Sequence, residues 1–245
     1  MVTKHTNYLN LSNTKTQKRF IKTSLLLVTL IAAVVIIGLR TDSISSKALT
    51  SVYSDYTSAD DFERPKLGKN WSINFGNVGI VHRSDLGLLS SSGMGLVTWE
   101  KLSFGPDQFS EIILPLDISP NMMVQPFVRR SGNDQAPRYG FGWDDEALRW
   151  YFKYDGGPQT RILATNTSYS PPVPGDTVRI EVSGTHPVAL KGFHNGTLVL
   201  EATDAEYNRI LDGRPGIAYR LKLGTGATYP APAVEIWRGG RILIP

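Results

Sequence analysis

The residues best suited to chemistry lie in one segment, 138–154, in which apolar and polar residues alternate. This period of two is typical of a β-hairpin, and we expect the four-residue loop 144–147 to join its strands. In that register Trp143 faces Leu148 across the hairpin. One face then carries basic side chains and a phenol around two glycines, which predicts a shallow strip surrounded by hydrogen-bond donors. We call this set the polar strip: Arg138, Gly140, Gly142, Arg149, Tyr151 and Lys153.

The other face of the same hairpin is aromatic. It carries Tyr139, Phe141, Trp143, Leu148, Trp150, Phe152 and Tyr154. Each aromatic ring buries about 150–250 Å² in a core, so we interpret this face as the contact between two sheets. A platform on which a sugar ring stacks is the alternative. For the polar strip, the alternative to ligand binding is an ordinary solvated sheet face.

Neighbouring carboxylates occur at two places. Asp60 and Asp61 form one pair, and Asp144-Asp145-Glu146 form a cluster in the expected hairpin loop. Carboxylate oxygens suit a hard cation such as calcium, and Asp60 and Asp61 are our metal candidates. Acid-rich turns without a bound metal are the alternative.

Other catalytic signals are weak. His82, His186 and His194 are too scattered for a local metal motif. The chain has no cysteine, which excludes thiol catalysis and cysteine-based zinc sites. It also contains no Gly-x-Ser-x-Gly motif.

From Asp60 onward the chain is typical of an all-β domain. Alternating runs of five to eight residues are separated by Gly, Pro, Asn and Asp, as in sandwiches and barrels. Asn195-Gly196 between two such runs predicts a tight hairpin turn. Strands are expected over residues 108–114, 124–130, 176–182, 188–194, 197–201 and 216–223. A last strand is expected with Val234 and Ile236 on one face and Glu235 and Trp237 on the other. The only short helix or helical turn is expected over residues 204–211.

Residues 23–39 form an uncharged stretch of 17 residues. A helix of this length spans about 25 Å. Phe20 and Ile21 bring it close to the bilayer core of about 30 Å if Lys22 extends to the interface. A buried soluble helix would show a more polar face. We therefore expect one transmembrane signal-anchor helix.

The flanking charges predict its orientation. Lys4, Lys15, Lys18, Arg19 and Lys22 precede the segment, and no acidic residue precedes Asp42. The positive-inside rule then places the N-terminus in the cytoplasm and the remainder outside it. The expected parts are a basic tail 1–22, the helix 23–39, a flexible stalk 40–59, a folded domain 60–240 and a tail 241–245. A cleaved signal peptide, with a site near residues 46–48, is the alternative.

The overall charge of +4 comes from the basic residues of the N-terminal tail. Six of the 26 Lys and Arg residues lie at or before Arg40, and all 22 Asp and Glu residues follow it. Residues 41–245 therefore carry a formal charge of −2. A nucleic-acid-binding domain would show a basic excess of its own, so nucleic acid is excluded as a partner.

Several weak motifs together carry a family resemblance over residues 60–240. They are Asp60-Asp61-Phe62 with Trp71, Trp99 with residues 104–108, residues 128–132, residues 175–181, residues 195–200 with Asp204, and residues 213–217. In order and spacing the chain resembles the concanavalin A-like jelly rolls, specifically laminin-G-like domains. This resemblance implies two antiparallel sheets of about six or seven strands, with the first and last strands adjacent. It also implies that any glycan would bind on a concave face.

The chain departs from the catalytic members of that superfamily. Their Glu-x-Asp-x-(x)-Glu cluster is absent, and Glu111 and Asp117 stand six residues apart. The closing segment 234–240 lacks the Asp-rich ending on which a calcium site would rest.

We therefore expect an all-β, two-sheet antiparallel jelly-roll sandwich, preceded by one transmembrane helix. The expected function is non-catalytic binding of carbohydrate or another surface polymer. Candidate contacts, on faces that we infer to be concave, are Arg129, Arg138, Arg149, Tyr151 and Lys153. The alternatives are a glycoside hydrolase or lyase with an atypical active site, and a structural or adhesive domain that binds protein.

Overall fold

The computed structural model describes residues 57–82, 84–89, 93–116, 122–132, 136–156, 159–221 and 233–243. They belong to one compact unit, Asp55–Pro245. The predicted cytoplasmic tail, the helix 23–39 and the stalk up to residue 56 lie outside the described residues. Within the described ranges, no helix has the length and apolar character needed to cross a membrane.

The described residues form two large antiparallel sheets and one small one. The first large sheet has six strands, in the order β1 (Thr57–Asp60), β16 (Ile236–Arg241), β6 (Gln108–Ile113), β11 (Thr177–Ser183), β12 (Val188–His194) and β13 (Thr197–Asp204). The second has seven strands, in the order β10 (Gln159–Asn166), β9 (Arg149–Gly156), β8 (Arg138–Asp144), β7 (Met122–Arg130), β14 (Arg214–Leu221), β5 (Gly93–Trp99) and β2 (Trp71–Phe75). The third contains β15 (Ala233–Val234), β4 (Asp85–Leu88) and β3 (Val78–Val81).

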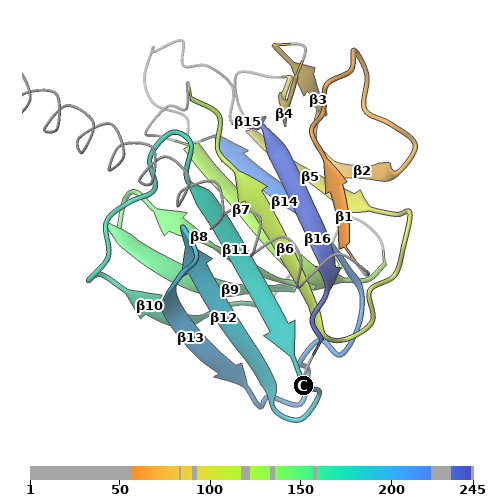
Figure 1. Cartoon of the computed structure of the whole chain (residues 1–245). Coiled ribbons are helices and arrows are strands. Elements are labelled where there is room, and N and C mark those ends of the chain that lie inside the picture. Colours follow the sequence, from red (N-terminus) through yellow and green to blue (C-terminus); the bar gives the residue numbers. More distant parts are fainter. Residues whose placement is uncertain are drawn as a thin grey trace, which may run out of the picture. The chain divides into compact units, whose positions relative to one another are not determined.

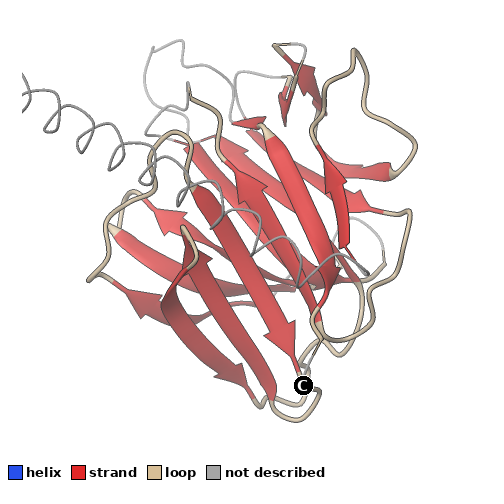
Figure 2. Ribbon diagram, in the orientation of Figure 1, coloured by secondary structure: helices blue, strands red, loops and turns tan. Residues whose placement is uncertain are grey.

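The two large sheets lie face to face, with the six-stranded sheet nearer the viewer in Figure 1. Among the described elements every regular one is a strand, joined to the next by loops and turns (Figure 2). The first strand, β1, pairs with the last, β16, as the family resemblance implied. The two-sheet antiparallel sandwich is thereby confirmed. The small third sheet was not predicted.

Alternating side chains build the core between the sheets. Val178, Ile180 and Val182 of β11 are all buried, as their spacing predicted. The aromatic face of the β8–β9 hairpin is also buried at all its six aromatic residues, whereas Leu148 is exposed. This confirms its interpretation as inter-sheet core and leaves no exposed sugar platform there.

A second aromatic cluster occupies the core next to β1. The rings of Trp71, Trp99 and Trp237 have centroids 4.8–5.2 Å apart. These three residues come from β2, β5 and β16, so they join the seven-stranded sheet to the six-stranded one. Tilted and edge-to-face contacts of this kind contribute beyond the area they bury.

The register predicted for the β8–β9 hairpin was wrong by two residues. Trp143 pairs with Trp150 and Asp144 with Arg149, so the four-residue loop runs from 145 to 148. Leu148 belongs to this loop, has φ of 49° and is exposed. A shift of two residues keeps the side chains of the paired residues on their predicted faces, and only Leu148 leaves the aromatic face.

The prediction for the last strand was also wrong. The last strand is interrupted at Glu235, so Val234 pairs with β4 while Trp237 lies in β16, and both are buried. Of the short helix or helical turn predicted over residues 204–211, only a single turn at residues 206–209 forms. There, Tyr139 donates a hydrogen bond to Asp204 and accepts one from the Ile210 amide, at 2.8 and 2.9 Å. The single turn is closed by the backbone bond from the Arg209 amide to the Glu206 carbonyl oxygen, at 3.3 Å.

The Asn195-Gly196 turn forms as predicted. His194 pairs with Thr197 across it, and both central residues have positive φ, 50° and 75°. This is the backbone geometry that a two-residue hairpin requires.

Candidate functional site

Four of the five predicted ligand residues lie together. Arg138, Arg149, Tyr151 and Lys153 project from β8 and β9 on the side of the seven-stranded sheet opposite the core. Trp150, which alternates with them, is fully buried. We call this side of the seven-stranded sheet the outer face. Ligand binding by these residues stays a prediction.

The charges of the polar strip are paired. The guanidinium of Arg138 contacts Oδ2 of Asp155, and Lys153 Nζ lies 3.3 Å from the same oxygen. Burial alone would raise the pKa of Asp155, but Arg138 and Lys153 hold it below its ordinary value. Arg149 Nε lies 3.8 Å from a carboxylate oxygen of Asp144. The three cations of the strip are therefore paired with two carboxylates, Asp155 and Asp144.

Tyr151 is covered by its neighbours and only 3% exposed. The amide of Gln125 contacts its hydroxyl, and burial raises the pKa of the phenol far above its ordinary value. The glycines of the strip make room for this pair, because a Cβ at Gly142 would lie 2.9 Å from Gln125 Cγ. The predicted depression over the glycines is therefore filled by Gln125.

Arg129, the fifth predicted residue, is fully buried. Its Nε, Nη1 and Nη2 donate to the carbonyl oxygens of Pro106, Ile210 and Gly184, at 2.7, 2.8 and 2.6 Å. A ligand on the outer face has no access to this guanidinium.

A bulge in β7 explains the placement of Arg129. Phe127 pairs with Gly216 whereas Arg130 pairs with Arg214, so β7 has one extra residue over this interval. Arg129 has φ of 54°, in the left-handed region. The extra residue inverts the alternation of side chains. Arg129 thus turns away from the outer face, and Arg130 takes its place there.

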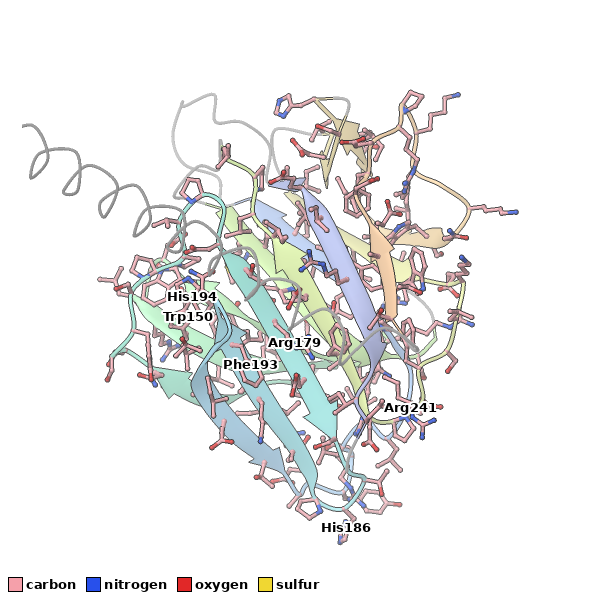
Figure 3. All side chains as sticks on the ribbon, viewed as in Figure 1. Trp150, Arg179, His186, Phe193, His194 and Arg241 are labelled. Atoms are coloured by element: carbon pink, nitrogen blue, oxygen red, sulfur yellow. The ribbon has the colours of Figure 1, made fainter. Side chains whose placement is uncertain are left out.

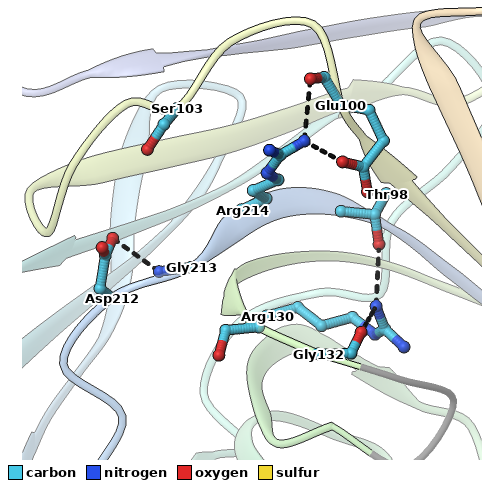
Figure 4. Close-up of a pocket in the computed structure, with 9 residues that line it drawn as sticks. Thr98, Glu100, Ser103, Arg130, Gly132, Asp212, Gly213 and Arg214 are labelled. Atoms are coloured by element: carbon cyan, nitrogen blue, oxygen red, sulfur yellow. Dashed lines mark hydrogen bonds and ion pairs between the residues drawn. The ribbon is translucent and has the colours of Figure 1, made fainter.

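Arg130 lines a cavity of about 430 Å³ at the end of the outer face. Thr98, in the same wall, pairs with Gly216, which in turn pairs with Phe127, so the cavity and the polar strip share one face. The lining residues have polar, charged or no side chains (Figure 4): Thr98, Glu100, Ser103, Arg130, Ser131, Gly132, Asp212, Gly213 and Arg214.

Hydrogen bonds order the charged walls of the cavity. Arg214 Nη1 donates to the Glu100 carbonyl oxygen at 2.8 Å and also contacts the Glu100 carboxylate. Arg130 Nη1 lies 3.4 Å from Thr98 Oγ1. With Asp212, the cavity presents two guanidinium groups and two carboxylates. Such a lining suits a ligand rich in hydroxyls or carrying charge, and not an apolar one.

Sequence reasoning missed this cavity. Five of its nine lining residues stand in segments that carried the family resemblance, 128–132 and 213–217. Strict alternation from Phe127, however, predicts Arg129 outward and Arg130 inward. Glu100 and Arg214 are 114 residues apart. Only the β5–β14–β7 pairing brings them together.

Asp60, a predicted metal ligand, uses both oxygens of its carboxylate to accept hydrogen bonds from the protein. Oδ1 accepts from the Phe62 amide and Arg64 Nη1, and Oδ2 accepts from Arg64 Nη2 and Trp71 Nε1, all at 2.6–2.9 Å. Among the described residues, Asp61 accepts one hydrogen bond, from the Glu63 amide at 3.2 Å. Within the described ranges, no three His, Asp or Glu side chains gather as a metal-binding group. These contacts give Asp60 a structural role.

The remaining candidates are also dispersed. Asp144 Oδ1 accepts from the backbone amides of Glu146 and Ala147 and so caps the hairpin loop. His194 lies 2.7 Å from Asp176 and beside Trp150, whereas His186 lies at the opposite end of β12 (Figure 3).

Comparisons with known proteins show the fold. No protein-family model and no curated protein sequence matches the chain. The β-glucanase of Bacillus licheniformis superposes with a TM-score of 0.53 at 13% identity, covering 78% of this chain and all of that one. The fold is a concanavalin A-like sandwich.

Two further solved structures give the same result. The carbohydrate recognition domain of Emp47p has a TM-score of 0.53 at 13% identity, covering 79% of this chain and 99% of that one. A Bacillus subtilis protein of unknown function with a galectin-like fold has a TM-score of 0.53 at 11% identity, covering 77% and 97%. Likeness at this level of identity establishes architecture and not activity.

Proposed function

We propose that the domain binds carbohydrate or a related surface polymer on the outer face of its seven-stranded sheet. The observation that carries the proposal is the polar cavity around Thr98, Arg130 and Arg214. It lies on the same face of the sheet as the polar strip. Two of the structures with this fold are, by name, a β-glucanase and a carbohydrate recognition domain.

The cavity favours binding over cleavage. Glycoside hydrolysis needs a protonated carboxyl group as acid and a second carboxylate as base or nucleophile. Glu100 and Asp212 are the carboxylates of the lining, but Glu100 contacts the guanidinium of Arg214. An adjacent cation favours the ionised form of a carboxyl group and so works against a general acid.

We also propose that residues 23–39 tether the domain to a membrane, with the N-terminus in the cytoplasm. The uncharged stretch and the five basic residues before it support this topology. A domain held in this way would meet polymers outside the cytoplasm.

The test of carbohydrate binding uses the full chain, purified in detergent, on a glycan array and on insoluble polysaccharides. We expect the wild type to bind at least one neutral or acidic glycan. Arg214→Ala removes a partly exposed cation of the cavity wall, and the lost charged hydrogen bond predicts a loss in affinity of about 10- to 100-fold. Arg149→Ala measures the separate contribution of the polar strip.

Arg238→Ala is the matched control. Arg238 is partly exposed and bonds to Glu111 at 3.0 Å, but it projects from the other large sheet. The affinity of Arg238→Ala for the glycan should stay within about twofold of that of the wild type. Failure of the wild type to bind any glycan, or equal affinities of Arg214→Ala and wild type, refutes the proposal. New reducing ends in the bound polysaccharide would instead favour the hydrolase.

A further inference from the structure

Two polar side chains behind the cavity are completely enclosed. Gln108 and Arg129 each have no exposed surface, although neither lines the cavity. Enclosed polar groups of this size are costly unless all their hydrogen-bonding atoms are used. Their partners therefore indicate what they hold in place.

Gln108 joins two loops that are far apart in sequence. Its Nε2 donates to the Gly105 carbonyl oxygen at 2.6 Å and to the Gly213 carbonyl oxygen at 2.9 Å. Its Oε1 accepts from the Arg129 amide at 3.2 Å. One side chain thus connects the loop after β5, the start of β14 and the bulge of β7.

Arg129 extends the same network. Its guanidinium binds the carbonyl oxygens of Pro106, Ile210 and Gly184, and lies 3.9 Å from Asp107. Asp107 in turn accepts from the Gly184 amide at 2.7 Å. The planar guanidinium donates in several directions and so binds three separate carbonyl groups at once. The single ammonium group of a lysine cannot reproduce this geometry.

The three segments joined in this way are the three walls of the cavity. Residues 98–103 lead into Gly105 and Pro106, residues 130–132 follow Arg129, and residues 212–214 include Gly213. The backbone of Gly213 also packs directly on that of Arg129 and Arg130, since a Cβ there would come within 2.6 Å of Arg130. The positions of the walls thus depend on these two side chains.

We propose that Gln108 and Arg129 are positioning residues that hold the walls of the cavity in their binding geometry. Their effect on ligand binding rests on the proposed function. The ordering of the walls does not, and it can be measured without a ligand. A site whose walls are already ordered loses less conformational entropy when it binds.

The test measures amide hydrogen exchange in the full chain and compares the wild type with Gln108→Met. This variant keeps the length of the side chain and removes its three hydrogen bonds. We expect exchange in residues 98–107 and 209–216 to accelerate by about tenfold, while β11 and β12 stay protected. Arg129→Lys, which retains the charge, makes the same comparison if Gln108→Met does not fold.

Arg179→Met is the matched control. Arg179 is another largely buried arginine, bonded to Glu181 at 2.6 Å, but it belongs to the six-stranded sheet and faces away from the cavity. Acceleration confined to the cavity walls in Gln108→Met, and absent in Arg179→Met, supports the proposal. Unchanged exchange in the walls, or equal acceleration throughout the domain, overturns it.

Binding to soluble β-1,3-1,4-glucan and to polygalacturonate is measured in parallel. Weaker binding by Gln108→Met than by Arg179→Met supports the positioning role, and unchanged affinity despite loosened walls overturns it. If the wild type binds neither probe while the walls still loosen locally in Gln108→Met, the role of Gln108 in ordering the cavity is supported. The proposed function in carbohydrate binding is then contradicted for these two probes.

Discussion

Replacing Asp60 with alanine removes the acceptor that joins β1 to the turn after it and to Trp71. Asp60 is 9% exposed, and its carboxylate accepts four hydrogen bonds, from the Phe62 amide, two nitrogens of Arg64 and the Trp71 indole. Trp71 in turn packs on Trp99 and Trp237 in the core. The substitution therefore acts where the two large sheets meet.

The structure sets the size of the effect. A hydrogen bond to a charged group contributes about 1.5–3 kcal/mol. Arg64 is partly exposed, so water replaces some of its lost bonds, whereas the Trp71 indole is buried and keeps no partner. Losing the two buried bonds, from the Trp71 indole and the Phe62 amide, predicts a destabilisation of about 3–5 kcal/mol. For a domain of this size, the melting temperature should fall by roughly 6–20 °C.

The effect should depend on pH. Burial alone would raise the pKa of Asp60, but the hydrogen bonds from Arg64, Trp71 and the Phe62 amide hold it below its ordinary value. The carboxylate therefore contributes its full stability above the unfolded-state pKa of about 3.9, and this contribution is lost as pH falls through the folded-state pKa. The difference between wild type and Asp60→Ala should be largest near pH 7 and shrink below about pH 4.

Urea unfolding followed by tryptophan fluorescence measures both effects. Asp61→Ala is the control, because Asp61 is exposed and should change stability by less than about 0.5 kcal/mol. A loss below about 1 kcal/mol in Asp60→Ala refutes the structural role. Stabilisation of the wild type by calcium, absent in Asp60→Ala, would instead support the metal site predicted from the sequence.

Gly192→Ala should destabilise the domain by about 1–3 kcal/mol, because a Cβ there would lie 2.4 Å from the ring of Phe141, and neutral behaviour in urea unfolding would contradict this packing. For the proposed membrane tether, a reporter that is active only outside the cytoplasm should be active when fused after residue 245. Activity of a cytosolic reporter at the same position would reverse the topology.

Local sequence patterns predicted the faces of strands better than their partners. Alternation identified the buried side of β11 and of the β8–β9 hairpin, because a period of two needs no knowledge of the rest of the chain. It could not identify the hairpin register, since pairing Trp143 with Leu148 or with Trp150 keeps the same faces. Nor could it show that Val234 and Trp237 belong to different sheets.

The candidate site shows the same limit. Arg138, Arg149 and Lys153 were predicted correctly as residues of one face, because each lies in an unbroken run of alternation. Their pairing with Asp155 and Asp144, and the covering of Tyr151 by Gln125, depend on side chains from other positions and on β7.

The sequence alone predicted an all-β sandwich, the tight turn at Asn195-Gly196 and the outward residues of β8 and β9. These features depend on short-range geometry. Only the tertiary structure decided between Arg129 and Arg130. The bulge that exchanges them is stabilised by carbonyl groups of Pro106, Ile210 and Gly184, which lie 23, 81 and 55 residues away from Arg129. Contacts at such separations leave no local pattern, and for that reason the cavity becomes visible only in the folded chain.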